Sequence, residues 1–212
     1  LTNGQRSREM KTIERYKKDQ KRTDVINNII KKNNYKKYLE IGVFCARDNF
    51  DKIKIEYKVG VDPGIGGRTD ATFTMTSDEF FELTNDKFDI VLVDGLHHAD
   101  QVYKDIINSL EVLNEGGTIV CHDMNPQRYK HQVIPQVRGI WNGDCWKAFV
   151  QLRMERTDLK MCVIDADWGL GIIQRGSQKK LEKGELTYDN FDKNRNEWLN
   201  LLSEKEFFEN WL

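Results

Sequence analysis

Five residues in the middle of the chain carry side chains suited to acid–base chemistry or metal binding. They are Asp94, His97, His98, His122 and Asp123. An imidazole titrates near neutral pH and can accept a proton, and a carboxylate can orient an imidazole or bind a divalent cation. Asp94 and His122 each come directly after a short apolar run. The site therefore depends on how these two runs are placed relative to each other.

The two apolar runs have the composition of neighbouring strands in a parallel sheet. Residues 88–93 and 118–121 are rich in Val, Ile and Leu, as strands buried on both faces are. Residues 99–115 have the apolar spacing of an amphipathic helix, and Gly116 and Gly117 predict where that helix ends. Ligands of open α/β sheets bind beyond the carboxyl ends of the strands. This unit therefore predicts that the five polar residues meet at one site.

A second set of candidate binding residues precedes this unit. Residues 37–41 predict a strand that leads through Gly42 into a short helix, and residues 58–61 predict a strand that ends in Asp62. A glycine at a strand-to-helix turn lets a ligand approach the backbone closely. An acidic residue at the end of the second strand can bind both ribose hydroxyls of a nucleoside. Residues 71–75 predict a third strand.

The amino-terminal segment predicts two helices. Residues 8–22 are strongly charged, and Thr23 and Asp24 predict the cap of a second helix. The second helix has an apolar stripe, and we expect it to cover the sheet. The stripe consists of Val25, Ile26, Ile29 and Ile30.

The chain after Asp123 begins with a long irregular stretch at residues 124–144. Loops of this length in a compact domain are usually functional or disordered. Its aromatic residues Tyr129 and Trp141 could anchor the loop or contact an acceptor. The pattern then predicts further elements and an amphipathic tail that could pack on the core. These are a helix at 145–156, strands at 161–164 and 170–173, and the tail at 176–212.

Composition limits the classes of partner. The formal net charge of -1 provides little attraction for phosphates, which argues against nucleic acid as a partner. Four scattered cysteines without a CxxC pair favour reduced thiols in an intracellular, cytoplasmic protein. No apolar run is long enough to predict a membrane span. The composition does not indicate an oligomeric state.

Four motifs, in this order, resemble the class I S-adenosylmethionine (SAM) dependent methyltransferases. They are LEIGVFCA at 39–46, VGVDPG at 59–64, FDIVLVDGLHH at 88–98 and GGTIVCHD at 116–123. The resemblance implies an α/β fold with a Rossmann-like, doubly wound sheet of seven strands. It further implies that this sheet is mostly parallel with an antiparallel last strand, and that helices lie at both ends of the chain. The chain departs from the family at Ala46, where the family has a later glycine of the first loop.

The same resemblance implies a domain organisation and a cofactor site. We expect residues 1–212 to form a single methyltransferase domain with a core at about 38–174, a helical extension at 1–37 and a helical tail at 176–212. Glu40 and Gly42 would line the methionine part of SAM, and Asp62 would hold the ribose. The full set of implied cofactor residues is Glu40, Gly42, Val43, Phe44, Asp62, Pro63, Met75, Thr76, Ser77, Asp94 and His97.

Within the superfamily, the motifs DGxH and GGxxxxHD resemble a subgroup linked to O-methylation of sugars and natural products. This implies a small-molecule or glycan acceptor, and members of the subgroup often hold a divalent metal at these strand ends. A glycan-assembly protein that carries such a domain beside glycosyltransferases would also account for a chain that begins with Leu1 rather than Met. We therefore expect methyl transfer to a sugar hydroxyl, in a protein fused to glycosyltransferases or acting with them.

The sequence is compatible with two mechanisms of methyl transfer, one with a divalent metal and one without. In the first, Asp94, His122 and Asp123 bind Mg²⁺ or Mn²⁺, and His97 is the general base. In the second, no metal takes part, His97 or His122 is the base, and Asp123 orients it. The residues expected to do chemistry are the same in both versions, namely Asp94, His97, His122 and Asp123.

Three other functions remain possible on this sequence. A nicotinamide-dependent oxidoreductase would share the first strands and the acidic residue for ribose, but the first loop lacks the G-x-G-x-x-G pattern and no clear Tyr-x3-Lys pair follows. A non-catalytic domain that only binds a partner would not need polar residues at several strand ends. An O-methyltransferase acting on a small molecule other than a sugar would need the same cofactor and catalytic residues, so the sequence does not distinguish it from a sugar methyltransferase.

Overall fold

A computed structural model describes residues 10, 21–65, 67 and 69–212. The first expected helix, at residues 8–22, lies almost wholly outside these residues. None of the helices among the described residues combines the length and the apolar character of a membrane span.

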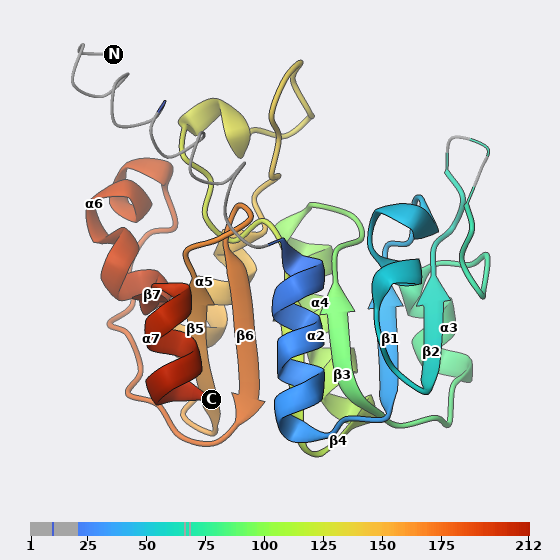
Figure 1. Ribbon diagram of the computed structural model, residues 1–212. Coiled ribbons are helices and arrows are strands. Elements are labelled where there is room, and N and C mark those ends of the chain that lie inside the picture. Colours follow the sequence, from blue (N-terminus) through green and yellow to red (C-terminus); the bar gives the residue numbers. More distant parts are fainter. Residues whose placement is uncertain (1–9, 11–20, 66, 68) are drawn as a thin grey trace.

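The centre of the molecule is one seven-stranded sheet in the order β2-β1-β3-β4-β6-β5-β7 (Figure 1). β6 runs antiparallel to both of its neighbours, and the other pairs are parallel. The predicted fold, a seven-stranded and mostly parallel Rossmann-like sheet, is confirmed. The antiparallel strand was expected to be the last one, but it is β6, and the last strand, β7, pairs with β5 in parallel. The strands are β1 Lys37–Ile41, β2 Tyr57–Val61, β3 Phe88–Val93, β4 Leu113–Cys121, β5 Leu159–Ile164, β6 Leu170–Arg175 and β7 Leu201–Leu202.

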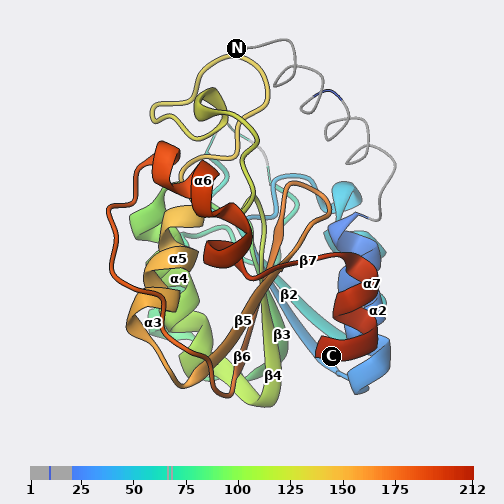
Figure 2. The same cartoon turned by 90° about the vertical axis from the view of Figure 1, so that its left-hand side faces the viewer.

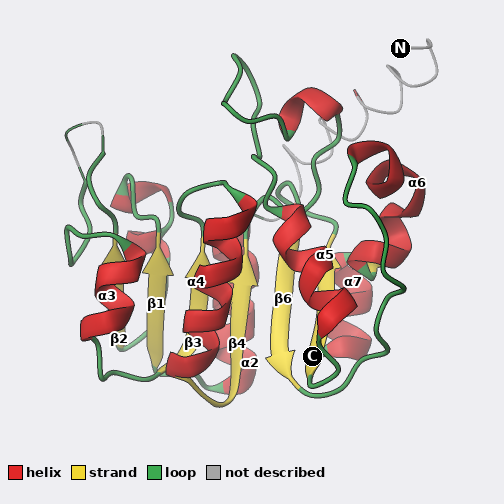
Figure 3. Cartoon of the chain, turned by 180° about the vertical axis from the view of Figure 1, so that it is seen from behind, coloured by secondary structure: helices red, strands yellow, loops and turns green. Residues whose placement is uncertain are grey.

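Helices cover both faces of the sheet (Figure 2). One face carries α2 and α7, and the other carries α3, α4 and α5, which are seen in front of the sheet in Figure 3. Alternate residues of each strand point to opposite faces, so there are two apolar clusters; Leu39 belongs to one and Tyr38 to the other. The helices are α2 Arg22–Asn33, α3 Ser77–Leu83, α4 Ala99–Val112, α5 Trp146–Glu155, α6 Tyr188–Leu199 and α7 Glu204–Glu206.

Short helical turns complete the described elements. Instead of the single short helix expected after Gly42, the chain forms two 3₁₀ turns. A 3₁₀ turn at residues 129–131 lies in the long loop, and a π-type turn ends the chain. They are η1 Ala46–Asp48, η2 Phe50–Lys52, η3 Tyr129–His131 and η4 Phe207–Trp211.

The third strand expected at residues 71–75 is not formed. Only Phe73 makes a bridge, to Val61, through Phe73 N–H to the Gly60 carbonyl at 2.9 Å and Asp62 N–H to the Phe73 carbonyl at 3.2 Å. Phe73 is 40% exposed, so the segment lacks the burial that would hold a full edge strand. The seventh strand is instead β7, from the carboxyl-terminal segment.

The predicted end of the central helix was also wrong. Helix α4 ends at Val112, and β4 begins at once with Leu113, so Gly116 and Gly117 lie inside the strand. The pairing with β3 shifts there, because Phe88 pairs with Leu113 whereas Ile90 pairs with Thr118. Gly116, in this irregular part of β4, has φ of 71°, a left-handed conformation that glycine adopts most easily.

Both ends of the described chain pack on the sheet. Helix α2 begins one residue before the predicted cap, and Asp24 accepts a hydrogen bond from the Lys21 N–H at 3.4 Å. Its predicted apolar stripe is buried, as expected, in the same cluster as Phe207 of the tail. Trp198 is buried in the other cluster, so the tail packs against both faces. The four cysteines are free thiols.

Candidate active site

The carboxyl ends of β3 and β4 bring together most of the residues expected to do chemistry. Asp94 N–H donates to the Ile41 carbonyl at 2.9 Å and His122 N–H donates to the Val93 carbonyl at 3.1 Å, so the ladder extends to these positions. His122 Nδ1 lies 3.2 Å from Asp94 Oδ1 and 3.3 Å from Asp123 Oδ2. Parallel pairing of adjacent strands therefore produces a compact group of two carboxylates and an imidazole.

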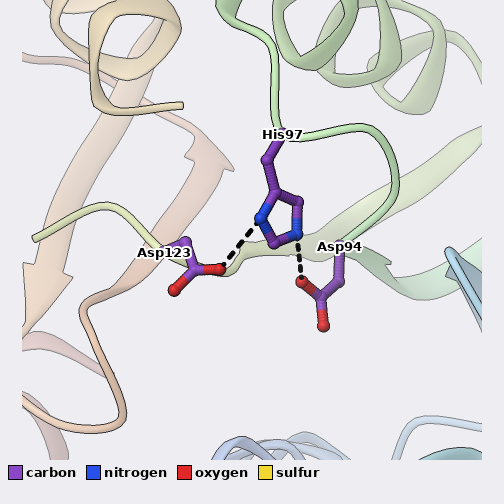
Figure 4. Close-up of side chains that lie close together, drawn as sticks. All are labelled: Asp94, His97 and Asp123. Carbon is purple, nitrogen blue, oxygen red and sulfur yellow. Dashed lines mark ion pairs between the residues drawn. The ribbon is translucent and has the colours of Figure 1, made fainter. Parts of the chain in front are cut away.

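His97 bridges the same two carboxylates (Figure 4). Its Nε2 lies 3.4 Å from Asp94 Oδ1, and its Nδ1 lies 3.3 Å from Asp123 Oδ2. The ring stacks on Trp141 at a centroid distance of 5.3 Å. His98 is the residue before α4 and is not among the residues that line the cavity described below. Of the two adjacent histidines, His97 is the one that joins this group.

The charges in this group stabilise one another. Burial alone would raise the pKa of Asp94, but His122, His97 and Arg22 together lower it by more, so that pKa lies well below its usual value. Burial would lower the pKa of His122, but the charges of Asp123 and Asp94 raise it well above the usual value. In the absence of a metal, these charges favour the protonated form of His122, which would balance the two carboxylates.

The pKa of His97 is raised to a lesser degree. Burial acts to lower that pKa, while the hydrogen bond with Asp94 and the charge of Asp123 raise it. The His97 side chain is 21% exposed, compared with 9% for His122. His97 is therefore the more accessible of the two imidazoles and the better placed to exchange a proton with a bound molecule.

Glu40 is a buried acid at the end of β1. It accepts a hydrogen bond from the Tyr38 hydroxyl at 2.5 Å and one from Asn49 Nδ2 at 2.8 Å. Burial raises the pKa of Glu40 to about 7, against the lowering effect of these two hydrogen bonds. The carboxyl group is held in one orientation, so a cationic ligand would meet it without reorganisation.

A cavity of about 670 Å³ lies beside these groups, a size that suits a small-molecule site. Two of the expected cofactor residues do not line it: Val43 is buried in one apolar cluster, and Met75 packs against the other. The remaining expected cofactor residues line it. They are Glu40, Gly42, Phe44, Asp62, Pro63, Thr76, Ser77, Asp94 and His97.

The first loop is fitted closely to the end of β3. Gly42 has φ of 98°, and a Cβ at this position would collide with the backbone of Asp94 and Gly95. Only glycine fits here, so the loop and the Asp94 segment form one continuous backbone wall. Asp62, at the end of β2, accepts a hydrogen bond from the Gly64 N–H at 2.7 Å, which orients its carboxylate at the cavity.

The donor set also fits a divalent cation. Asp94, His97 and Asp123 each offer one ligand atom, and these atoms lie within 4.8 Å of one another. His122 Nδ1 is close to the same carboxylates, so it belongs to the same set of possible ligands. Two oxygen and two nitrogen donors are compatible with Mn²⁺ and less so with Mg²⁺, which prefers more oxygen.

Several buried polar atoms at this site have no hydrogen-bond partner within the protein. They include Arg22 Nε, His97 Nδ1, His122 Nε2 and Asn142 Oδ1. Buried polar groups are usually satisfied, so a set of unsatisfied atoms beside a cavity favours a site that binds a polar ligand.

Three residues of this site were not predicted. Asn142 donates a hydrogen bond from Nδ2 to Asp123 Oδ1, and Asp167 Oδ2 lies 3.7 Å from His122 Nε2. Arg22 Nε lies 3.4 Å from Asp94 Oδ2. Asp167 follows the carboxyl end of β5, so the rule that located Asp94 would also have located it. Arg22 and Asn142 carry no such signal in the sequence.

The long loop closes one side of the site. Asn142 and Trp141 contact Asp123 and His97, and a Cβ at Gly143 would collide with the His97 carbonyl. Trp146, in the following helix, is fully buried against Phe191 and therefore anchors the fold.

Comparison with known proteins gives a family and a fold. A family model described as a methyltransferase domain matches residues 16–124, about half of the chain. A search of curated proteins found no match.

Solved structures share the fold at low identity. A Staphylococcus aureus protein assigned as a caffeoyl-CoA O-methyltransferase aligns with a TM-score of 0.53 and 18% identity, over 74% of this chain and 84% of that chain. The methyltransferase PaMTH1 of Podospora anserina, bound to S-adenosylhomocysteine (SAH), aligns with a TM-score of 0.52 and 15% identity, over 84% and 89%. The O-methyltransferase TomG of Streptomyces achromogenes, in complex with SAM, gives 0.50 and 11%, over 72% and 78%.

Proposed function

The chain belongs to the family of methyltransferase domains, and we propose that it is a SAM-dependent O-methyltransferase that acts on a hydroxyl group of a sugar, in a glycan or a glycoside. The family match favours a methyltransferase over the oxidoreductase alternative, because that alternative rested only on sequence features that bind a nucleoside and are common to both classes of enzyme. The finer assignment rests on the chemistry of the groups beside the cavity.

The observation that carries the proposal is the position of His97 between two carboxylates at the cavity wall. A sugar hydroxyl is a poor nucleophile until it loses its proton, so its methylation needs a base. SAM, when bound, supplies a methyl group that is susceptible to attack by an oxygen in line with the departing sulfur. His97 accepts the hydroxyl proton as the oxygen attacks, which leaves a methyl ether and a protonated imidazole.

His122 and Asp123 support this transfer. Asp123 Oδ2 lies 3.3 Å from Nδ1 of His97, and both carboxylates are close enough to stabilise the charge of the imidazolium that forms. Burial lowers the pKa of His122, but the charges of Asp123 and Asp94 raise it well above its usual value. This favours the protonated form, so His122 balances the carboxylates and is less suited than His97 to act as the base. In this mechanism the roles of the two histidines differ.

A divalent metal would be held by Asp94, Asp123 and one or both of His97 and His122. It would acidify the acceptor hydroxyl directly. In this metal-dependent mechanism His97 would serve as a ligand, and a carboxylate or solvent would accept the proton. Removal of the metal by EDTA distinguishes this mechanism from the metal-free one.

The acceptor is proposed as a sugar because the motifs resemble the sugar and natural-product subgroup and because the wall beside His97 is polar. A glycosyltransferase, fused to this domain or separate, would then supply the acceptor. The alternative acceptor is a small molecule that is not a sugar, which agrees with structural neighbours described as acting on caffeoyl-CoA and in tomaymycin synthesis.

The test is transfer of a labelled methyl group from SAM to a panel of glycosides, phenols and oligonucleotides, before and after exhaustive EDTA treatment. We expect labelled methyl ethers of one or more glycosides. Labelling only of phenols would favour the alternative acceptor, and no labelled product at all would contradict the proposal. Full activity after EDTA would rule out a catalytic metal, and activity restored only by Mg²⁺ or Mn²⁺ would establish one.

A further inference from the structure

Arg22 places a guanidinium at the wall of the cavity. It is the first residue of α2, and Figure 1 shows that this end of α2 lies at the edge of the sheet where β1 and β3 end. The Arg22 N–H donates to Asp167 Oδ2 at 2.8 Å, which ties the start of the helix to the β5–β6 turn. The side chain lines the cavity, in contrast to the adjacent Lys21.

The other charged side chains of the cavity are mostly acidic. Six carboxyl-bearing residues line it, and Arg22 is the one Lys or Arg among the lining residues in the described part of the chain. The acids are Glu40, Asp48, Asp62, Asp78, Asp94 and Asp123. A ligand with positive groups suits this lining, whereas a carboxylate on the same ligand would be repelled by the acids and attracted by Arg22, whose charge is permanent.

The donors of the Arg22 guanidinium are incompletely used within the protein. Its Nε is 3.4 Å from Asp94 Oδ2 and has no hydrogen bond, and one terminal nitrogen is 3.8 Å from Asp167 Oδ2. The side chain is 25% exposed, and its Nε is a buried atom without a hydrogen-bond partner in the protein. A guanidinium has five N–H donors, so Arg22 can donate to a further acceptor on a bound ligand.

From this arrangement we infer that Arg22 binds the α-carboxylate at the amino-acid end of SAM, an assignment that rests on the SAM-binding part of the proposed function. The amino-acid end carries both an ammonium and a carboxylate. Glu40 and Asp94, on either side of Gly42, suit the ammonium, and the planar fork of Arg22 suits the carboxylate. The N-terminal helix therefore contributes to the cofactor site as well as covering the sheet.

The test compares SAM with decarboxylated SAM, which keeps the ammonium and sulfonium but lacks the carboxylate. Affinities are measured by calorimetry for the wild type, Arg22→Gln, Arg22→Lys and the control Lys21→Gln. The control removes the same charge one residue away, from a side chain that is 50% exposed and lies 3.8 Å from the same Asp167. Thermal unfolding without ligand checks that each variant is folded.

We expect Arg22→Gln to weaken SAM binding by roughly 10- to 100-fold and to leave the affinity for decarboxylated SAM unchanged. Arg22→Lys should lose part of the SAM affinity, and Lys21→Gln should lose none. An equal loss for both ligands would overturn the inference, because it would mean that Arg22 acts only through Asp94. If the wild type binds neither ligand, the proposed function itself fails. Unchanged SAM affinity with a raised KM for the acceptor would assign Arg22 to the acceptor and would also overturn the inference.

Discussion

Among the single residues, His97 carries the largest part of the proposed chemistry. His97→Ala removes the base while leaving the first loop and Asp62 in place, so we expect kcat to fall roughly 10²-fold or more with little change in the Kd of SAM. The matched control is His98→Ala, since His98 is adjacent in sequence and does not line the cavity. Steady-state kinetics and calorimetry give the two quantities. Near-normal turnover in His97→Ala would place the chemistry on another residue.

Glu40 gives a second prediction at this scale, about stability and pH. The pKa of Glu40 is about 7 in the folded protein and about 4.5 for an ordinary Glu. Between pH 4.5 and 7, Glu40 is therefore protonated to a greater extent in the folded state than in the unfolded state. The contribution of Glu40 to the free energy of unfolding therefore falls as pH rises from 4.5 to 7, by roughly 2–4 kcal/mol. Glu40→Gln should become more stable than the wild type over this range, as measured by denaturant unfolding at several pH values. A stability difference between Glu40→Gln and the wild type that does not change with pH would contradict this prediction.

Among the secondary-structure elements and loops, the long loop after β4 packs directly against His97, through Trp141 and Gly143. Gly143 and Gly139 both have positive φ, 64° and 112°, but only Gly143 packs against His97, while Gly139 has open space around its Cα. Gly143→Ala must displace the loop or the His97 backbone, so we expect kcat to fall at least about 10-fold. Gly139→Ala carries only the backbone strain, of order 1–3 kcal/mol, and should keep most of the activity. Equal activity in the two variants would show that the loop does not position His97.

The strand ends explain which parts of the site could be predicted. Asp94, His122 and Asp123 follow apolar runs, and parallel strands place such residues at one edge. Arg22 and Asn142 reach the site from a helix start and a loop, whose positions depend on tertiary packing that no local pattern records. The strand expected at residues 71–75 had the composition of a strand but not the burial. The glycine pair expected to end α4 instead lies in β4, where the pairing with β3 changes register.

At the scale of the whole molecule, the two terminal segments stabilise the sheet together. Phe207 of the tail is fully buried in the cluster that contains the apolar stripe of α2. Phe207→Ala should lower the free energy of unfolding by roughly 3–5 kcal/mol in a single transition, whereas the partly buried Phe208→Ala should cost less. Denaturant unfolding followed by fluorescence and circular dichroism measures both. A separate early transition for the tail would contradict the prediction that residues 1–212 form a single domain.

Binding of SAM in the cavity is measured by calorimetric titration of SAM into the wild type and into Asp62→Ala. Asp62 is oriented by the Gly64 N–H at 2.7 Å and is proposed to hold the ribose hydroxyls. We expect the wild type to bind SAM and Asp62→Ala to lose about 1–3 kcal/mol of binding free energy. Asp70→Ala, which removes an exposed acid outside the cavity, should bind as the wild type does. Absence of SAM binding by the wild type, or equal affinity in Asp62→Ala, would contradict the account.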